Sequence, residues 1–209
     1  MRIDRLEAFS DGVYAILITI LVLEFSVPEY QVGHLMERVL TQWPIMFAYV
    51  ISFVYVGAIW LFHHDFFQTL KYTSMELNVI NLVVLFSVTL IDYPTALVAQ
   101  ALMERNVKDM RFSFIYYELI AMFISVTFAV LYSYVRKHPE LTHRNDHQQK
   151  IYADIKMDPL ISVSIYGVAV IITIFSPWWG LLVLVLGIIY HFIAYIRLGS
   201  RMQKTIRLE

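Results

Sequence analysis

The sequence predicts an all-helical membrane protein with six transmembrane helices, arranged as a single domain of residues 1–209. The first observation behind this fold class is composition. Of the 209 residues, 59% are hydrophobic and only 16% are charged, whereas soluble domains carry about 25% charged residues. The mean hydropathy is +0.62. The second observation is a series of apolar stretches near the length of about 20 residues that a helix needs to cross a bilayer.

The first predicted span covers residues 5–25. Asp4 and Glu7 have the spacing of a capping box, so we expect the helix to start there. The uninterrupted apolar run, residues 13–23, rises only about 16 Å as a helix, against a hydrocarbon core of about 30 Å. The helix therefore carries Asp11 into the membrane, where an acid is costly unless it faces protein or water. We expect this helix to line a polar path.

A narrow stripe of residues at helical spacing runs along this first helix. At about 100° per residue, the stripe comprises Phe9, Gly12, Ile16, Ile20 and Leu23, with Thr19 beside it. Gly12 allows close approach of another backbone. The stripe is therefore either a packing seam or the wall of a narrow pore. The residue types by themselves favour the seam, and both interpretations stay open.

The second span covers residues 43–64, with Trp43-Pro44 placing a proline in its first turn. The third span covers residues 75–101. Pro94 should kink this span or end its regular part, because proline cannot complete the helical hydrogen-bond pattern. The neighbouring Asp92 fits a structural role at such a kink better than an ion site.

The fourth span covers residues 112–135, and the long polar segment 136–158 that follows is typical of a solvated cytoplasmic loop. The fifth and sixth spans cover residues 160–176 and 178–198. A tight turn with interfacial tryptophans, Ser176-Pro177-Trp178-Trp179-Gly180, joins them. With the N-terminus inside, only four of the sixteen basic residues lie outside: Arg38, Arg105, Lys108 and Arg111. The positive-inside rule therefore predicts that both termini are cytoplasmic, in the cell (cytoplasmic or inner) membrane.

Several functional classes are excluded by what the sequence lacks. There is no cysteine, which excludes disulfides and cysteine nucleophiles, and a net charge of -1 gives no basic character for nucleic acid. The T-V-G-Y-G filter of common potassium channels, voltage-sensor arginine repeats, nucleotide-binding loops and hydrolase motifs are missing. We therefore expect no enzyme, no cofactor and no catalytic residues. The two halves show no obvious inverted repeat, which weakens a transporter interpretation.

The segment Arg5-Leu6-Glu7-Ala8-Phe9-Ser10-Asp11-Gly12 matches the R-x-x-x-F-S-D-G signature of the transmembrane-protein-175 family, the lysosomal and prokaryotic potassium channels. The resemblance implies that the first helix lines the pore and that a single-repeat prokaryotic form assembles as a homotetramer. It also implies that Ile16, Ile20 and Leu23 face the pore, with Ile16 at the narrowest point. Thr19 beside this ring offers a hydroxyl as a second route to ion selection.

The end of the second span also resembles the family, which has a Trp-x-x-His-His-like end to this helix. The resemblance implies an inner cluster composed of Arg5, Phe9, Ser10, Asp11, Gly12, Trp60, His63 and His64. The residues alone leave open that Arg5, Asp11 and the two histidines are merely interfacial. Adjacent residues point to different helix faces, so we expect no metal site at His63 and His64.

Taken together, the residues and the resemblance imply a potassium-selective or potassium-preferring cation channel. It would conduct passively through a homotetrameric pore with a hydrophobic constriction from the first helix. Its partners would be copies of itself, membrane lipid and permeant cations, with potassium as the permeant species. Two alternatives stay open: an ion-coupled or proton-coupled secondary transporter built on Asp11, His63 and Asp92, and a non-conducting membrane scaffold.

Overall fold

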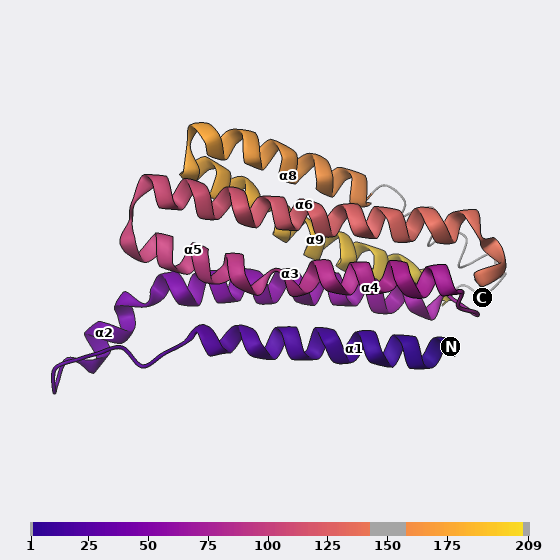
Figure 1. Ribbon diagram of the computed structural model, residues 1–209, viewed down its shortest axis with the longest axis horizontal. Helices are drawn as coiled ribbons and strands as arrows, with labels where there is room; N and C mark the ends of the chain where they lie inside the picture. Colours follow the sequence, from indigo (N-terminus) through magenta and orange to yellow (C-terminus); the bar gives the residue numbers. More distant parts are fainter. Residues whose placement is uncertain (1, 143–157, 207–209) are drawn as a thin grey trace.

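The computed structural model describes residues 2–142 and 158–206, which fold into long helices lying side by side (Figure 1). The helices are α1 (Ile3–Ile20), η1 (Leu21–Glu24), α2 (Leu35–Thr41), α3 (Trp43–Gln68), α4 (Met75–Thr89), α5 (Asp92–Glu104), α6 (Val107–Lys137), η2 (Pro139–Leu141), α8 (Asp158–Phe175) and α9 (Pro177–Ile206). The chain is thus an all-helical membrane protein, as the composition predicts.

Five segments in the described part of the chain are long and apolar enough to cross a membrane. They are Ile3–Leu23, Trp43–Gln68, Met75–Glu104, Val107–Lys137 and Pro177–Ile196. The segment Leu160–Phe175 is also apolar but shorter. These segments make the chain an integral, multi-pass membrane protein. The fifth span of the sequence prediction corresponds to the shorter helix, so its crossing stays a prediction.

The start of α1 differs from the expected capping box. The helix begins at Ile3 with Arg2 as its N-cap, and no described side chain caps it. Asp4 lies inside the first turn, where its carboxylate pairs with Arg2. The predicted capping box is wrong because Asp4 already has helical geometry and cannot take the extended conformation of a cap. An acid in the first turn still stabilises the helix through its dipole.

The third predicted span bends where the sequence places a proline. α4 ends at Thr89 and α5 begins at Asp92, so Pro94 lies in the first turn of α5 (Figure 1). A proline there costs no helical hydrogen bond, because the first N–H groups of a helix have no partner within it. The Thr95 N–H donates to the Ile91 carbonyl at 3.2 Å, which continues the chain into α5. The expectation that Pro94 ends the regular part of the span is confirmed.

Interhelical hydrogen bonds between buried side chains hold the middle of the bundle. The Ser52 hydroxyl on α3 lies 2.7 Å from the Thr95 hydroxyl on α5 and 3.0 Å from the Tyr117 hydroxyl on α6. Thr173 on α8 donates to the Glu118 carboxylate on α6 at 2.7 Å. Such bonds suit a membrane interior, where apolar side chains gain little by leaving equally apolar lipid.

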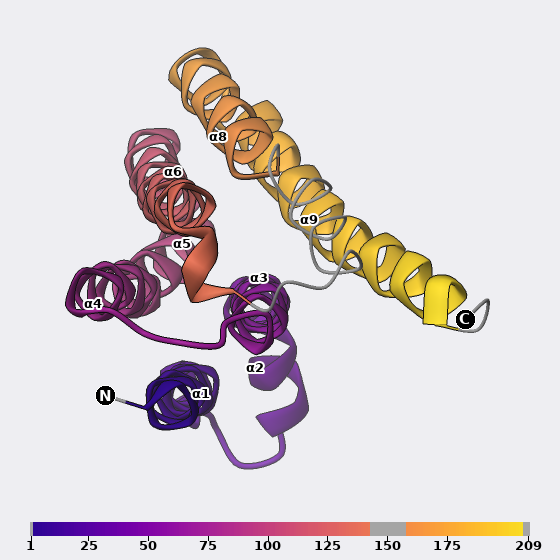
Figure 2. The ribbon, with the colours of Figure 1, turned by 90° about the vertical axis from the view of Figure 1, so that its right-hand side faces the viewer.

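α1 lies at the periphery of this bundle. It packs against α3 and α4, while α8 and α9 lie on the far side of α6 and α3 (Figure 2). One side of α1 therefore contacts other helices, and the other side is left uncovered by residues 2–142 and 158–206. This placement decides which side chains of α1 reach the interior and which are available to other molecules.

Candidate functional site

The two faces of α1 differ in exposure. Leu6, Ser10, Tyr14 and Leu17 are buried against the bundle. The opposite face carries the predicted stripe, whose large side chains on α1 have exposed fractions of 52% at Phe9, 61% at Ile16 and 37% at Ile20. Leu23, the last residue of the stripe, lies on η1 and is 76% exposed. Among the described residues, the stripe is therefore not a packing seam between helices of one chain. It is free to contact another copy, an ion path or lipid.

A buried chain of hydrogen bonds connects three helices near the N-terminal end of α1. The His63 ring on α3 donates from Nε2 to Asn81 Oδ1 on α4 at 2.8 Å. Asn81 Nδ2 then donates to the Ser10 hydroxyl on α1 at 2.9 Å, and that hydroxyl donates to the Leu6 carbonyl at 2.9 Å. His63, Asn81 and Ser10 are at most 1% exposed. The chain of donors fixes the rotation of α1 against α3 and α4.

The ring of His63 is further held by aromatic neighbours. It stacks on Phe67 with ring centroids 4.2 Å apart and lies 5.3 Å from the Tyr14 ring of α1. Packing on both sides leaves this histidine no freedom to turn toward the surface. His63 is therefore a structural junction of the buried hydrogen-bond chain.

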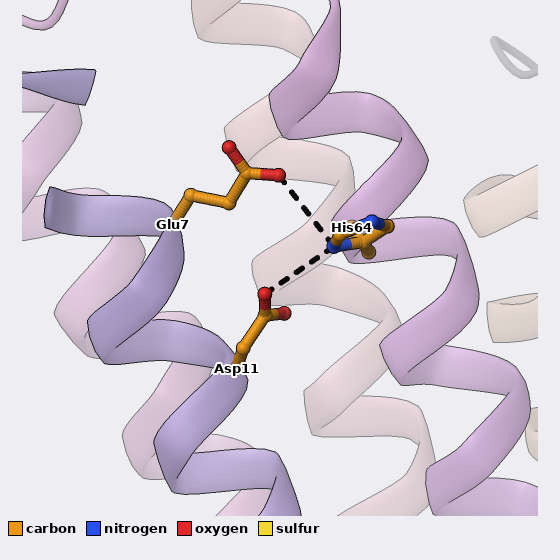
Figure 3. A group of neighbouring side chains, drawn as sticks. All are labelled: Glu7, Asp11 and His64. Atoms are coloured by element: carbon orange, nitrogen blue, oxygen red, sulfur yellow. Dashed lines mark ion pairs between the residues drawn. The ribbon is translucent and has the colours of Figure 1, made fainter. Parts of the chain in front are cut away.

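A second polar cluster lies beside the first and is half-buried. Trp60 Nε1 donates to Asp11 Oδ1 at 2.9 Å. His64 Nδ1 lies 3.4 Å from Asp11 Oδ2 and 3.5 Å from Glu7 Oε1, so two carboxylates of α1 face one imidazole of α3 (Figure 3). The ligand atoms of Glu7, Asp11 and His64 all lie within 4.8 Å of one another, close enough to hold a metal ion.

The structure brings together five of the eight residues expected in the inner cluster: Ser10, Asp11, Trp60, His63 and His64. The other three residues, Arg5, Phe9 and Gly12, lie on the exposed side of α1. The reason is their position around the helix: Arg5 lies one turn before Phe9 on the same exposed side, whereas Ser10 lies on the buried face. Within a single chain, their side chains point away from the cluster.

Thr19 lies on the exposed side next to Ile16 and Ile20. Its hydroxyl is positioned to donate to the carbonyls of Ala15 at 2.9 Å and Ile16 at 2.8 Å. A hydroxyl has one proton and two acceptor lone pairs. With the proton directed to the backbone, the oxygen keeps its acceptor capacity for an ion or a water molecule.

Sequence reasoning missed two residues of the site, Asn81 and Glu7. Glu7 and Asp11 are four residues apart and therefore share a helix face, a signal that the sequence does contain. Asn81 is a polar residue in an apolar span, which marks an interior-facing position. Its partners on α1 and α3 are 71 and 18 residues away in the chain, so no local pattern identifies them.

Comparisons with known proteins agree with this architecture. Residues 5–91 match the family model described as endosomal/lysosomal potassium channel TMEM175. A potassium channel of Chamaesiphon minutus is 30% identical over 177 residues, covering 83% of this chain and 85% of that protein. The chain belongs to the TMEM175 family. The matched range contains α3, α4, all of α1 except its first two residues, and both polar clusters, so the site described above lies in the part that the TMEM175 model recognises.

Two further comparisons extend the TMEM175 assignment. A potassium channel of Streptomyces collinus is 36% identical over 129 residues, and the alignment spans 61% of this chain and 62% of that protein. The crystal structure of a lysosomal potassium-selective channel TMEM175 homologue from Chamaesiphon minutus superposes with a TM-score of 0.78 at 28% identity. It covers 92% of this chain and 97% of that chain. TMEM175 proteins are ion channels and not enzymes, in accord with the missing catalytic motifs.

Proposed function

We propose that this chain is one subunit of a homotetrameric potassium channel, selective or at least preferring potassium, in the cell membrane. Each subunit would cross the membrane six times, with the short helix α8 as one crossing and with both termini in the cytoplasm. Membership of the TMEM175 family supports potassium as the permeant ion. The observation that carries the proposal is the uncovered stripe of α1.

Exposure by itself does not identify a pore helix, because lipid-facing helices also expose apolar side chains. Ile171 on α8, for example, is 59% exposed. α1 differs because its uncovered side also presents Gly12 and Thr19, and because it borders the acids Glu7 and Asp11. Charged groups facing lipid are costly, so they favour protein or water as neighbours. Copies of α1 around a symmetry axis supply both.

In such a tetramer, Ile16, Ile20 and Leu23 would each form a ring of apolar side chains around the axis. A narrow apolar ring offers an ion no replacement for its hydration water and closes the path by dewetting. Potassium loses water more readily than sodium, so the ring favours potassium. Thr19 would contribute through its acceptor lone pairs, immediately beside the ring of Ile16.

The two polar clusters would serve the pore indirectly. The buried chain from His63 through Asn81 to Ser10 sets the rotation of α1, and that rotation decides which residues face the axis. Arg5 and Phe9 lie on the uncovered side of α1. In the tetramer these two side chains would meet a neighbouring subunit at the cytoplasmic mouth and not the cluster of their own chain.

Potassium flux in liposomes tests the proposal with a matched pair of variants. Ile16→Asn should wet the narrowest ring, raise basal current and erode the preference for potassium over sodium. Ile171→Asn is the control, because it makes the same change at a side chain of nearly equal exposure, 59% against 61%, away from α1. This control should conduct like the parent.

The same recordings separate the alternatives. A coupled transporter would require a counter-substrate and turn over slowly, and a scaffold would pass no current. If Ile16→Asn assembles normally and leaves both current and selectivity unchanged, the hydrophobic constriction is refuted. If the parent protein passes no ions at all, the channel assignment itself fails.

A further inference from the structure

His64 Nδ1 occupies an unusual position between two carboxylates. It is buried and makes no hydrogen bond to any described residue, although Asp11 Oδ2 lies at 3.4 Å and Glu7 Oε1 at 3.5 Å. N–H···O hydrogen bonds to ionised acceptors are normally about 2.7–2.9 Å long. The three groups thus converge from two helices, yet they stand farther apart than direct hydrogen bonds would hold them (Figure 3).

These separations are those of ligands around a small divalent ion. Zinc binds histidine nitrogen and carboxylate oxygen at about 2.0–2.2 Å in tetrahedral geometry, which places neighbouring ligand atoms about 3.3–3.5 Å apart. The two distances from His64 Nδ1 match that edge. All three ligand atoms of Glu7, Asp11 and His64 lie within 4.8 Å of one another, so a small movement of one carboxylate closes the third edge.

We propose that Glu7, Asp11 and His64 bind a divalent transition-metal ion of the zinc class, which connects α1 to α3. One imidazole and two carboxylates make a mixed nitrogen and oxygen donor set, which suits zinc better than magnesium or calcium with their all-oxygen preference. The side chains are 23%, 34% and 29% exposed for Glu7, Asp11 and His64, respectively. This exposure gives the ion access and leaves a fourth position for water.

Neighbouring residues orient the proposed ligands through hydrogen bonds, as residues behind the ligands (outer partners) do in known metal sites. Trp60 donates to Asp11 Oδ1 at 2.9 Å and leaves Oδ2 for the ion. The Gln68 amide lies 2.8 Å from His64 Nε2, on the far side of the ring from the carboxylates. When the ion takes Nδ1, the ring proton is carried by Nε2, and this N–H donates a hydrogen bond to the Gln68 amide oxygen after the amide turns over.

The alternative is an imidazole–carboxylate ion pair without a metal. Both separations also lie within ion-pair range, so zinc binding by the parent and its loss in Glu7→Gln are what distinguish the metal site from such a pair. The metal site does not depend on conduction. Glu7 and Asp11 lie on successive turns of α1, and His64 lies on α3. The ion would therefore hold these two helices together whether or not the pore conducts.

Zinc titration of the purified, chelator-treated full chain in detergent tests the proposal, with calorimetry for affinity and thermal melting for stability. The decisive variant is Glu7→Gln, which keeps the side-chain size. The matched control is Glu37→Gln, because Glu37 faces His34 Nδ1 at 3.1 Å in an exposed pair at the start of α2. Zinc should bind the parent and Glu37→Gln alike and raise the melting temperature of both.

Losing a residue that only hydrogen-bonds to a metal ligand costs roughly 10–100-fold in metal affinity. Glu7→Gln removes a ligand itself, so its zinc affinity should fall by more than that. Zinc should also no longer raise the melting temperature of this variant. Trp60→Phe removes an outer partner and should lose affinity within that range. Cobalt as a probe should give the absorption of a four-coordinate ion in the parent and not in Glu7→Gln. The proposal is overturned if the parent binds no zinc, or if Glu7→Gln binds zinc as tightly as Glu37→Gln.

Discussion

Asn81 is the residue whose replacement should most clearly reveal how α1 is held. It is fully buried and bonds to His63 on one side and Ser10 on the other, so one side chain joins α4 to α3 and α1. Leucine has nearly the same shape and no polar atoms. Asn81→Leu therefore removes two interhelical hydrogen bonds; His63 Nε2 loses its acceptor, whereas the Ser10 hydroxyl keeps its bond to the Leu6 carbonyl.

The expected magnitude follows from the setting of these bonds. Interhelical hydrogen bonds in membrane proteins are worth about 0.6 kcal/mol on average and about 1.7 kcal/mol at most. Two of them give about 1.2 kcal/mol, which corresponds to a fall of about 2–5 °C in the melting temperature for a protein of this size. A soluble-core estimate of 1–3 kcal/mol per unsatisfied group gives a larger loss, as an upper bound.

Thermal melting in detergent should compare Asn81→Leu with Asn78→Leu. Asn78 lies one turn earlier on α4, and its side-chain bond within the described part of the chain is a local one from Thr73, so its replacement should cost less. A double-mutant cycle with Ser10→Ala should return a coupling of about 0.6 kcal/mol between Ser10 and Asn81. The idea that Asn81 fixes α1 would be refuted if the two leucine variants had equal melting temperatures and the coupling free energy between Ser10 and Asn81 were zero.

Two further predictions concern the uncovered side of α1. Thr19→Val keeps the side-chain shape but removes the hydroxyl. It should lower the preference for potassium over sodium in liposome flux only if the oxygen contacts the ion. We expect its effect on this preference to be smaller than that of Ile16→Asn. Ile20→Cys introduces the single cysteine of the chain and should cross-link subunits under mild oxidation, whereas Ile171→Cys on α8 should not. A cross-linked Ile171→Cys with an unlinked Ile20→Cys would place a different helix at the axis.

Local chemistry made part of this site predictable from the sequence. The stripe of α1 follows from the helical period alone, and it is the face that the described part of the chain leaves uncovered. The break near Pro94 follows from the missing N–H of proline. The divergence of His63 and His64 follows from the angle between adjacent residues on a helix: one is buried against Asn81, and the other faces the carboxylates of α1.

Other features depended on how the helices pack. The sequence places Asp11 and Trp60 on separate helices, and only the packing of α1 against α3 brings them to 2.9 Å. Arg5 belongs to the same sequence signature as Ser10 and Asp11 but lies on the exposed side of α1. A shared signature does not specify which way each side chain points.

The sequence by itself therefore determined the membrane class, which residues share the α1 stripe and the position of the helix break, because each depends on composition or on residues within a turn or two. The tertiary structure alone decided that Asn81 bridges Ser10 and His63 and that Glu7 and Asp11 share one imidazole. The physical reason is that the rotation and register of neighbouring helices result from all their contacts together. No local pattern in one helix specifies which side chain of another helix it will meet.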